Sequence, residues 1–153
     1  MKIISIKEIL NLRKNKTLVT TNGSFDILHV GHLRILKAAK EMGDILLVLV
    51  NSDMSVKLNK GKERPIINLS ERMELLAGLE CVDYVLPFNE KEVLYILEKI
   101  KPDIHVKGGT FIPERVQKEK DLVEEHGGKH ECLGKIGNFS TSNIIEKIKS
   151  TLV

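Results

Sequence analysis

The sequence predicts an α/β fold in which an open five-stranded parallel sheet carries helices on both faces. Apolar blocks alternate with stretches of helical periodicity along the chain, and this alternation is typical of a parallel sheet with helical crossovers. The block "ILLVLV" at 45–50 is apolar on both faces, as expected of a central strand. No linker, repeat or low-complexity segment interrupts the pattern, so residues 1–153 are expected to form a single domain.

The expected elements follow one another in a regular order. Residues 1–16 are expected to form an N-terminal helical extension, with Ile6, Ile9 and Leu10 at helical spacing. A basic loop is expected over 53–68, and Ser70 is a candidate cap for the helix that follows it. Strands are expected over 17–23, 44–52, 82–88, 102–109 and 129–134, and the remaining helices over 30–43, 69–80, 90–100, 114–126 and 141–151.

Composition narrows the class of protein and its partners. A net charge of +3 is too weak to argue for duplex DNA, and 4% aromatic residues without tryptophan disfavour base stacking, so no nucleic-acid partner is expected. Cys81 and Cys132 form no CxxC motif and are too few for a disulfide framework. No apolar run approaches membrane-spanning length and the start lacks a signal peptide, so a cytoplasmic protein without a membrane partner is expected.

The segment "FDILHVGH" places two histidines where the first strand gives way to a helix. Such a junction directs backbone N–H groups and the positive end of a helix toward a ligand above the sheet. Gly31 removes a side chain that would keep a phosphate away from the backbone, and the imidazoles of His29 and His32 can donate to phosphate oxygens whose charge grows during reaction. A zinc site is less favoured here, because helical zinc pairs stand at i and i+4 beside a glutamate.

The stretch "NGSFDILHVGHLRILKAAKEMGD" resembles the HxGH signature of the nucleotidyltransferase superfamily that includes the cytidylyltransferases and phosphopantetheine adenylyltransferase. The resemblance continues through "VNSDMSVKLNKGKERPIINLSERMELLAGLECVDYVLPF", "PDIHVKGG" and "STSNIIEKI", over roughly residues 17–149. Together these segments most resemble the adenylyltransferase domain of bacterial ADP-heptose synthase. The resemblance implies a Rossmann-like, HUP-type nucleotidyltransferase fold.

The resemblance also implies an activity. An acceptor phosphate attacks the α-phosphorus of a nucleoside triphosphate, and pyrophosphate leaves with the Mg²⁺ that accompanies the nucleotide. The favoured reaction is the transfer of AMP from ATP to a heptose 1-phosphate, giving ADP-heptose. Without a covalent enzyme intermediate, the protein mainly positions groups and stabilises charge. Related enzymes are commonly homo-oligomers, and a dimer is expected here.

Site roles follow from the resemblance and from the loops at the carboxyl ends of the expected strands. The groups expected to act in catalysis are His29, His32, Lys60 and Arg72. The groups expected to bind the nucleotide are Gly23, Ser24, Phe25, Gly31, Lys107, Gly108, Gly109, Ser140, Thr141 and Ser142. The groups expected to bind substrate are Asn51, Asp53, Lys57 and Arg64. No residue is expected to hold a metal ion.

Structural roles compete with several of these assignments. Ser140 or Thr141 can simply cap the last helix, Arg72 can be an exposed helix charge, and the glycines of "VKGG" can form a plain turn.

A second histidine cluster is expected to have no function. The probable helix end at Gly127–Gly128 separates His126 from His130, so the segment "HGGKHEC", including Cys132, is expected at the surface. His105 is expected to pack within its strand.

Alternative activities remain open at this stage. A CTP-dependent cytidylyltransferase acting on glycerol 3-phosphate, another alcohol phosphate or a phosphonate shares the signature, as does an adenylyltransferase similar to FAD synthase. Thr110 and Phe111 replace an acid and a phenol that heptose enzymes often carry, and Lys135 stands where glycerol-3-phosphate cytidylyltransferases have an arginine. A non-catalytic nucleotide-binding module is the alternative from a different class.

Overall fold

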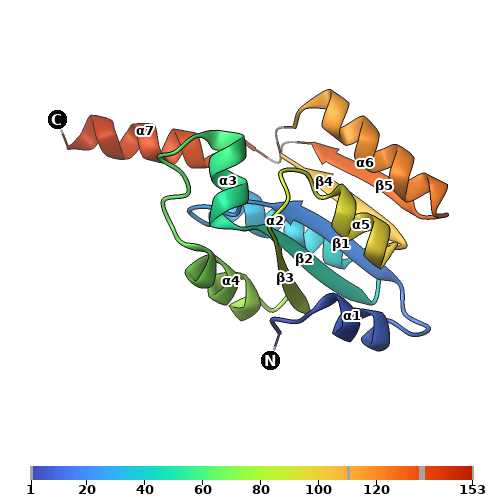
Figure 1. Ribbon diagram of the computed structural model, residues 1–153. Coiled ribbons are helices and arrows are strands. Elements are labelled where there is room, and N and C mark those ends of the chain that lie inside the picture. Colours follow the sequence, from blue (N-terminus) through green and yellow to red (C-terminus); the bar gives the residue numbers. More distant parts are fainter. Residues whose placement is uncertain (1, 110, 135–136, 153) are drawn as a thin grey trace.

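Five parallel strands form one open sheet, in the order β3-β2-β1-β4-β5 (Figure 1). A computed structural model describes residues 2–109, 111–134 and 137–152. The strands are β1 (Leu18–Gly23), β2 (Ile45–Asn51), β3 (Tyr84–Phe88), β4 (Ile104–Gly108) and β5 (Lys129–Gly134). Strand order changes direction between β1 and β4, which is where α/β sheets open a crevice for ligands. The predicted sheet is confirmed.

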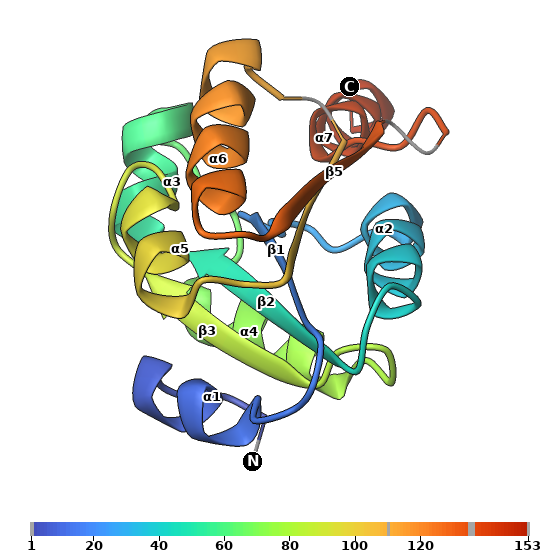
Figure 2. The same cartoon turned by 90° about the vertical axis from the view of Figure 1, so that its right-hand side faces the viewer.

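Helices cover both faces of this sheet, as predicted, and Figure 2 shows α2 and α6 on opposite sides of it. The buried clusters place α1, α5 and α6 on one face and α2 and α4 on the other. In the described part of the chain, none of the helices is both long and apolar enough to cross a bilayer. The helices are α1 (Ile6–Leu12), α2 (Val30–Lys40), α3 (Asp53–Lys60), α4 (Leu69–Gly78), α5 (Leu94–Ile100), α6 (Pro113–Glu125) and α7 (Thr141–Thr151).

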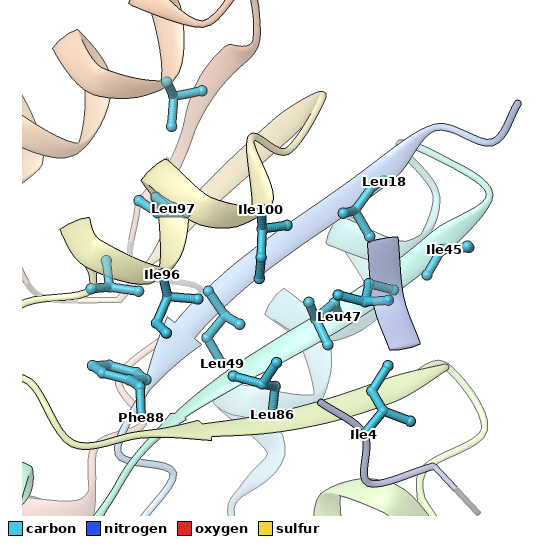
Figure 3. Packing of buried hydrophobic residues seen from close by; sticks show 13 residues of the cluster. Ile4, Leu18, Ile45, Leu47, Leu49, Leu86, Phe88, Ile96, Leu97 and Ile100 are labelled. Carbon is cyan, nitrogen blue, oxygen red and sulfur yellow. The ribbon is translucent and has the colours of Figure 1, made fainter. Parts of the chain in front are cut away.

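Alternate side chains of β2 supply the two cores. Leu47 and Leu49 pack against α5 in the cluster drawn in Figure 3, while Val48 and Val50 pack toward α2 and α4. All four are fully buried, and burial of each such side chain stabilises the fold by roughly 1.5–3 kcal/mol. This two-sided burial explains the continuous apolar run in the sequence and fixes the strand ends that carry the loops of the site.

One expected loop contains a helix. Residues 53–60, assigned from the sequence to a basic loop, form α3. The Ser52 hydroxyl accepts a hydrogen bond from the Ser55 amide at 3.2 Å, and Gly61 ends the helix with a φ of 95°. Val56 is fully buried, whereas Met54 and Leu58 of the same helix are each 58% exposed. The short apolar side of this helix was too weak a periodic signal to predict it from the sequence, although the capping residues at both ends were visible there.

The cap of α4 also differs from the expected one. Asn68, rather than Ser70, is the N-cap, and its side-chain oxygen accepts from the Glu71 amide at 3.1 Å. The Ser70 hydroxyl donates to that same oxygen at 2.6 Å, so Ser70 supports the cap from within the first turn.

Candidate active site

A cavity of about 690 Å³ lies beyond the carboxyl ends of β1, β2 and β4, at the predicted crevice. Its volume is in the range of small-molecule sites. The ends of β1 and β4, the first turn of α2, the end of α3 and the start of α7 all contribute to its wall. The predicted site residues that line it are Gly23, Ser24, Phe25, His29, Gly31, His32, Asn51, Lys60, Arg64, Lys107, Gly108, Gly109, Ser140, Thr141 and Ser142.

Two stacked imidazoles mark the start of α2. His29 is the N-cap residue, and its ring lies over that of His32 with centroids 3.8 Å apart and planes 22° apart. The His29 amide donates to Nδ1 of His32 at 3.3 Å. A Cβ at Gly31 would come within 3.0 Å of both the His29 ring and the Cβ of Phe139. Glycine therefore makes room for the histidine ring itself, in addition to any approach of a ligand.

Both histidines are electrically neutral in the ligand-free protein at neutral pH. Burial, His29 and Lys60 lower the pKa of His32 to about 4, and burial lowers the pKa of His29. Since Nδ1 of His32 accepts from a backbone amide, its proton is assigned to Nε2. A neutral imidazole of this kind can donate a hydrogen bond to an anion and can also take up a proton as negative charge develops nearby.

Cations gather around this pair. Burial, Arg64 and Arg72 lower the pKa of Lys60, while Asp26 acts in the opposite direction. Arg64 Nε donates to Asp26 Oδ2 at 2.8 Å, while its Nη2 is buried without a partner among the described residues. Such an arrangement favours an anionic ligand, whose oxygens would satisfy the unpaired donor.

Asp26 fixes the segment that carries Arg64. Its carboxylate accepts from the amides of Ile66 and Ile67, both at 2.9 Å. Burial alone would raise the pKa of Asp26, but these amides and Arg64 outweigh that effect and lower it. Asp26 was absent from the predicted site, although it lies inside the histidine motif; its role depends on a contact made some forty positions along the chain.

Arg72 lies below the cavity rather than in its wall. Its side chain is fully buried and donates to the carbonyl oxygens of Ser24, Asn51 and Ile67 and to Asp53 Oδ1 at 2.7 Å. The arginine thus ties the loops after β1 and β2 to the start of α4. The predicted contact with substrate phosphate has no support in this geometry, because every bond of the guanidinium points to protein acceptors.

Two further predicted residues lie away from the cavity. Asp53 is the partner of Arg72, and Lys57 is exposed on α3 without lining the cavity.

The start of α7 is capped by its own side chain and also lines the cavity. The Ser140 hydroxyl accepts from the Asn143 amide at 3.1 Å, so it caps the helix. The Thr141 hydroxyl donates to the Asp26 carbonyl at 2.7 Å, and both residues line the cavity. A second helix N-terminus therefore faces the same space as α2.

The cavity wall also contains residues that the sequence analysis did not identify. Lys107 Nζ donates to Asn22 Oδ1 at 3.1 Å and to Glu119 Oε1 at 2.9 Å, so the predicted lysine is held by two partners that were missed. Thr110 and Lys135, which distinguish the alternative activities, lie outside the described residues. Phe111, which the sequence analysis singled out as a departure from the heptose enzymes, also lines the cavity. The other wall residues missed from the sequence are Thr21, Asp26, Ile35, Asn59, Lys91, Glu92, Val93, Ile112, Arg115 and Phe139.

The two buried carboxylates of the wall are each paired with a cation. Asp26 is engaged by Arg64 at 2.8 Å, and Glu119 is engaged through its Oε1 by Lys107 at 2.9 Å. Mg²⁺ is commonly bound through one or two carboxylates together with substrate phosphates and waters, so an ion that accompanies a nucleotide would be held mainly by phosphate oxygens and water.

The second histidine cluster only partly lies where it was expected. His126 and Cys132 are exposed, as predicted. The His130 side chain is only 1% exposed, so its surface prediction is wrong: on β5 its side chain faces the buried side beneath α6. His105 is fully buried within β4, as predicted.

Comparison with known proteins places this geometry in a family context. A family model described as cytidylyltransferase-like matches residues 20–153. The chain is 46% identical over 146 residues to the bifunctional protein HldE of Syntrophotalea carbinolica, covering 94% of this chain and 30% of that protein. It is 48% identical to HldE of Geotalea uraniireducens, covering 90% and 28%. The chain therefore spans less than a third of these curated relatives.

Solved structures resemble the chain as well. A lipopolysaccharide core biosynthesis protein from Thermoplasma volcanium is 31% identical, with a TM-score of 0.66, and the match covers 79% of this chain and 98% of that chain. Pantoate-beta-alanine ligase from Francisella tularensis superposes with a TM-score of 0.65 at 19% identity, covering 100% of this chain and 78% of the ligase. The second likeness concerns the fold alone and agrees with the predicted Rossmann-like architecture.

Proposed function

The chain belongs to the cytidylyltransferase-like family, and we propose that it is a nucleotidyltransferase that moves AMP from ATP to a heptose 1-phosphate, releasing pyrophosphate and ADP-heptose. The observation that carries the proposal is the stacked pair of neutral imidazoles at a helix start, inside a cavity surrounded by cations. That arrangement suits a polyphosphate chain better than a neutral or cationic ligand.

The reaction needs no covalent step on the enzyme. An oxygen of the acceptor phosphate attacks the α-phosphorus of ATP, and the bond between that phosphorus and the α–β bridging oxygen breaks. The bridging oxygen leaves with pyrophosphate and its negative charge. His29 and His32 would donate hydrogen bonds to phosphate oxygens as that charge develops, which is preorganised electrostatic stabilisation. Mg²⁺ accompanies the triphosphate and offsets its charge.

Some of the remaining cationic side chains would bind substrate, and one would support the backbone of the cavity wall. Lys60 and Arg64 line the cavity and are assigned to phosphate oxygens of ATP or acceptor. Arg72 is reassigned to support, because its bonds hold the backbone of Ser24 and Asn51 in the cavity wall. Lys107, held by Glu119, is assigned to the nucleotide at the end of β4.

Relatives support the choice of substrate. The sequence resembles the adenylyltransferase domain of ADP-heptose synthase, and a match to under a third of a bifunctional relative is what one catalytic part would give. The Thermoplasma volcanium relative of known structure is described as a lipopolysaccharide core biosynthesis protein, which also supports a carbohydrate acceptor. The second candidate is a CTP-dependent cytidylyltransferase, favoured by the description of the matching family model.

Pyrophosphate release distinguishes the candidates. The purified protein would be incubated with ATP or CTP, and separately with heptose 1-phosphate, glycerol 3-phosphate or a simple phosphonate. We expect turnover with ATP and heptose 1-phosphate, and an ADP-sugar detected by mass spectrometry. Turnover with CTP and an alcohol phosphate instead would establish the second candidate. Triphosphate binding without turnover on any acceptor would point to a non-catalytic module.

Assembly and compartment are further parts of the proposal. Helix α7 has no buried residue, and Ile148 and the C-cap residue Leu152 are exposed, so we assign this helix to the interface of a homodimer. Light scattering should give twice the chain mass, and Ile148→Glu should give the monomer; an unchanged mass would reject the interface. The two cysteines are free thiols, which supports the expected reducing cytoplasm.

A further inference from the structure

Three metal-ligating side chains meet beneath α6, on the side of β4 and β5 that faces this helix. His105 and His130 are direct partners in the parallel register of the two strands, and Glu119 lies on the helix above them. Glu119 Oε2 is 3.6 Å from Nε2 of His105 and 3.9 Å from Nε2 of His130. One ligand atom from each residue lies within 4.8 Å of the other two.

These three atoms are buried and have no hydrogen-bond partner among the described residues. The side chains of His105, His130 and Glu119 are 0%, 1% and 5% exposed. Buried polar groups are nearly always satisfied, so three unpaired atoms that converge on one point call for an occupant. An occupant that accepts electron pairs from two imidazole nitrogens and a carboxylate oxygen is a metal cation.

We propose that His105, Glu119 and His130 bind a divalent transition-metal ion, with Zn²⁺ as the best-fitting class, at a structural site separate from the histidines of the active site. Two histidines and one glutamate form a known ligand set for zinc, with a fourth position left for water. A tetrahedral ion with bonds of about 2.1 Å needs ligand atoms about 3.4 Å apart, so the observed spacings close around an ion with only small shifts.

The surroundings already prepare the ligands. Nδ1 of His105 lies 2.8 Å from the Thr20 hydroxyl, which leaves Nε2 free to bind an ion and resembles the outer partners of zinc-bound histidines.

The position also has a consequence for the cavity, because Glu119 lines it. Its Oε1 accepts from Lys107, which means that an ion on Oε2 would fix the carboxylate that holds this lysine. The proposal does not depend on the proposed reaction, since binding is measured without nucleotide.

The test uses the whole chain, freed of metal by chelation and titrated with Zn²⁺ against a competing chromophoric chelator. We expect one ion per chain, and Co²⁺ should give the strong visible absorption of a four-coordinate site. His105→Gln, His130→Gln and Glu119→Gln should each weaken Zn²⁺ binding by at least about 100-fold, and Thr20→Val by about 10-fold. His126→Gln is the matched control, because it removes an exposed histidine from the same chain, and should leave binding unchanged.

A second measurement needs no variant and covers the case in which the substitutions prevent folding. The protein has five histidines, and NMR follows their ring protons separately. Zn²⁺ should shift His105 and His130 and leave His126 unmoved, while Mg²⁺ should shift none of the three. Failure to bind Zn²⁺, or shifts confined to His29 and His32, would overturn the proposal and leave the proposed reaction untouched.

Discussion

The molecule holds two pairs of histidines whose surroundings have opposite charge. His29 and His32 stack at the first turn of α2, half-buried in a cavity wall, with lysine and arginine as neighbours. His105 and His130 lie on adjacent strands under α6 and share a buried glutamate. The ring is the same in both cases. Its neighbours decide whether the pair suits an anion or a cation, because imidazole donates a proton to the first and an electron pair to the second.

Removal of either active-site ring should have the largest effect. His29→Ala or His32→Ala should lower kcat by roughly 10²–10³, the size expected for loss of one preorganised donor to developing charge. Steady-state pyrophosphate release measures this effect, with the exposed His126→Ala as control. Near-normal turnover by both variants would show that His29 and His32 do not act in catalysis, and the proposed functional difference between the two histidine pairs would be lost.

Substitution of Arg72 tests whether this arginine, near His29 and His32, supports the fold or contacts the ligand. Arg72→Leu strips the partners from three carbonyls and Asp53, and we expect the free energy of unfolding to fall by about 3 kcal/mol. Urea denaturation provides the measurement. A variant that keeps its stability but loses affinity for substrate phosphate would restore the role expected from the sequence.

The depressed pKa of His32 makes a prediction about pH. As the pH falls from 6.5 toward 4, the unfolded chain binds a proton at this ring before the folded protein does, so stability is complete above pH 6.5 and is lost on acidification. The loss of unfolding free energy between pH 7 and 4.5 should be smaller in His32→Gln than in the parent by about 2 kcal/mol.

Bound triphosphate should act on His32 in the opposite sense. An anion favours the imidazolium form, so the pKa of His32 should rise when ATP binds, as NMR titration would report. An unmoved His32 titration in the presence of bound ATP would argue against phosphate contact.

Substitution of Lys60 should have the smallest effect on activity, and Lys57 on the same helix provides its control. Both lie on α3, but Lys60 lines the cavity and Lys57 does not. Lys60→Ala should raise KM for ATP or for the acceptor about tenfold, the loss of one hydrogen bond to a charged group, with little change in kcat. Lys57→Ala should match the parent. Equal KM values in both variants would mean that Lys60 has no role in substrate binding and is an ordinary solvated charge on the helix.

Local pattern was sufficient for the sheet and for most of the cavity. The alternation of apolar and helical segments gave all five strands, and parallel topology then placed the loops after β1, β2 and β4 together. The motif around His29 and His32 located a pair of side chains that lines the cavity, because its residues are close in sequence. Helix α3 was missed because its apolar side reduces to a few residues such as Val56.

Contacts between distant segments could not be predicted in the same way. The burial of Arg72 depends on three loops that meet only in the folded chain. The meeting of His105 and His130 depends on the register between β4 and β5, which no local signal specifies. His105 by itself looked like a packed strand residue, and that prediction was correct.

Helix α7 contributes Ser140 and Thr141 to the cavity wall while burying none of its own residues. A partner that covered that helix would therefore also steady part of the cavity wall. In the dimer proposed above, association and nucleotide affinity would be thermodynamically linked, and the linkage is reciprocal. Dilution that separates the subunits would loosen the nucleotide, and saturating nucleotide would lower the concentration at which the subunits pair.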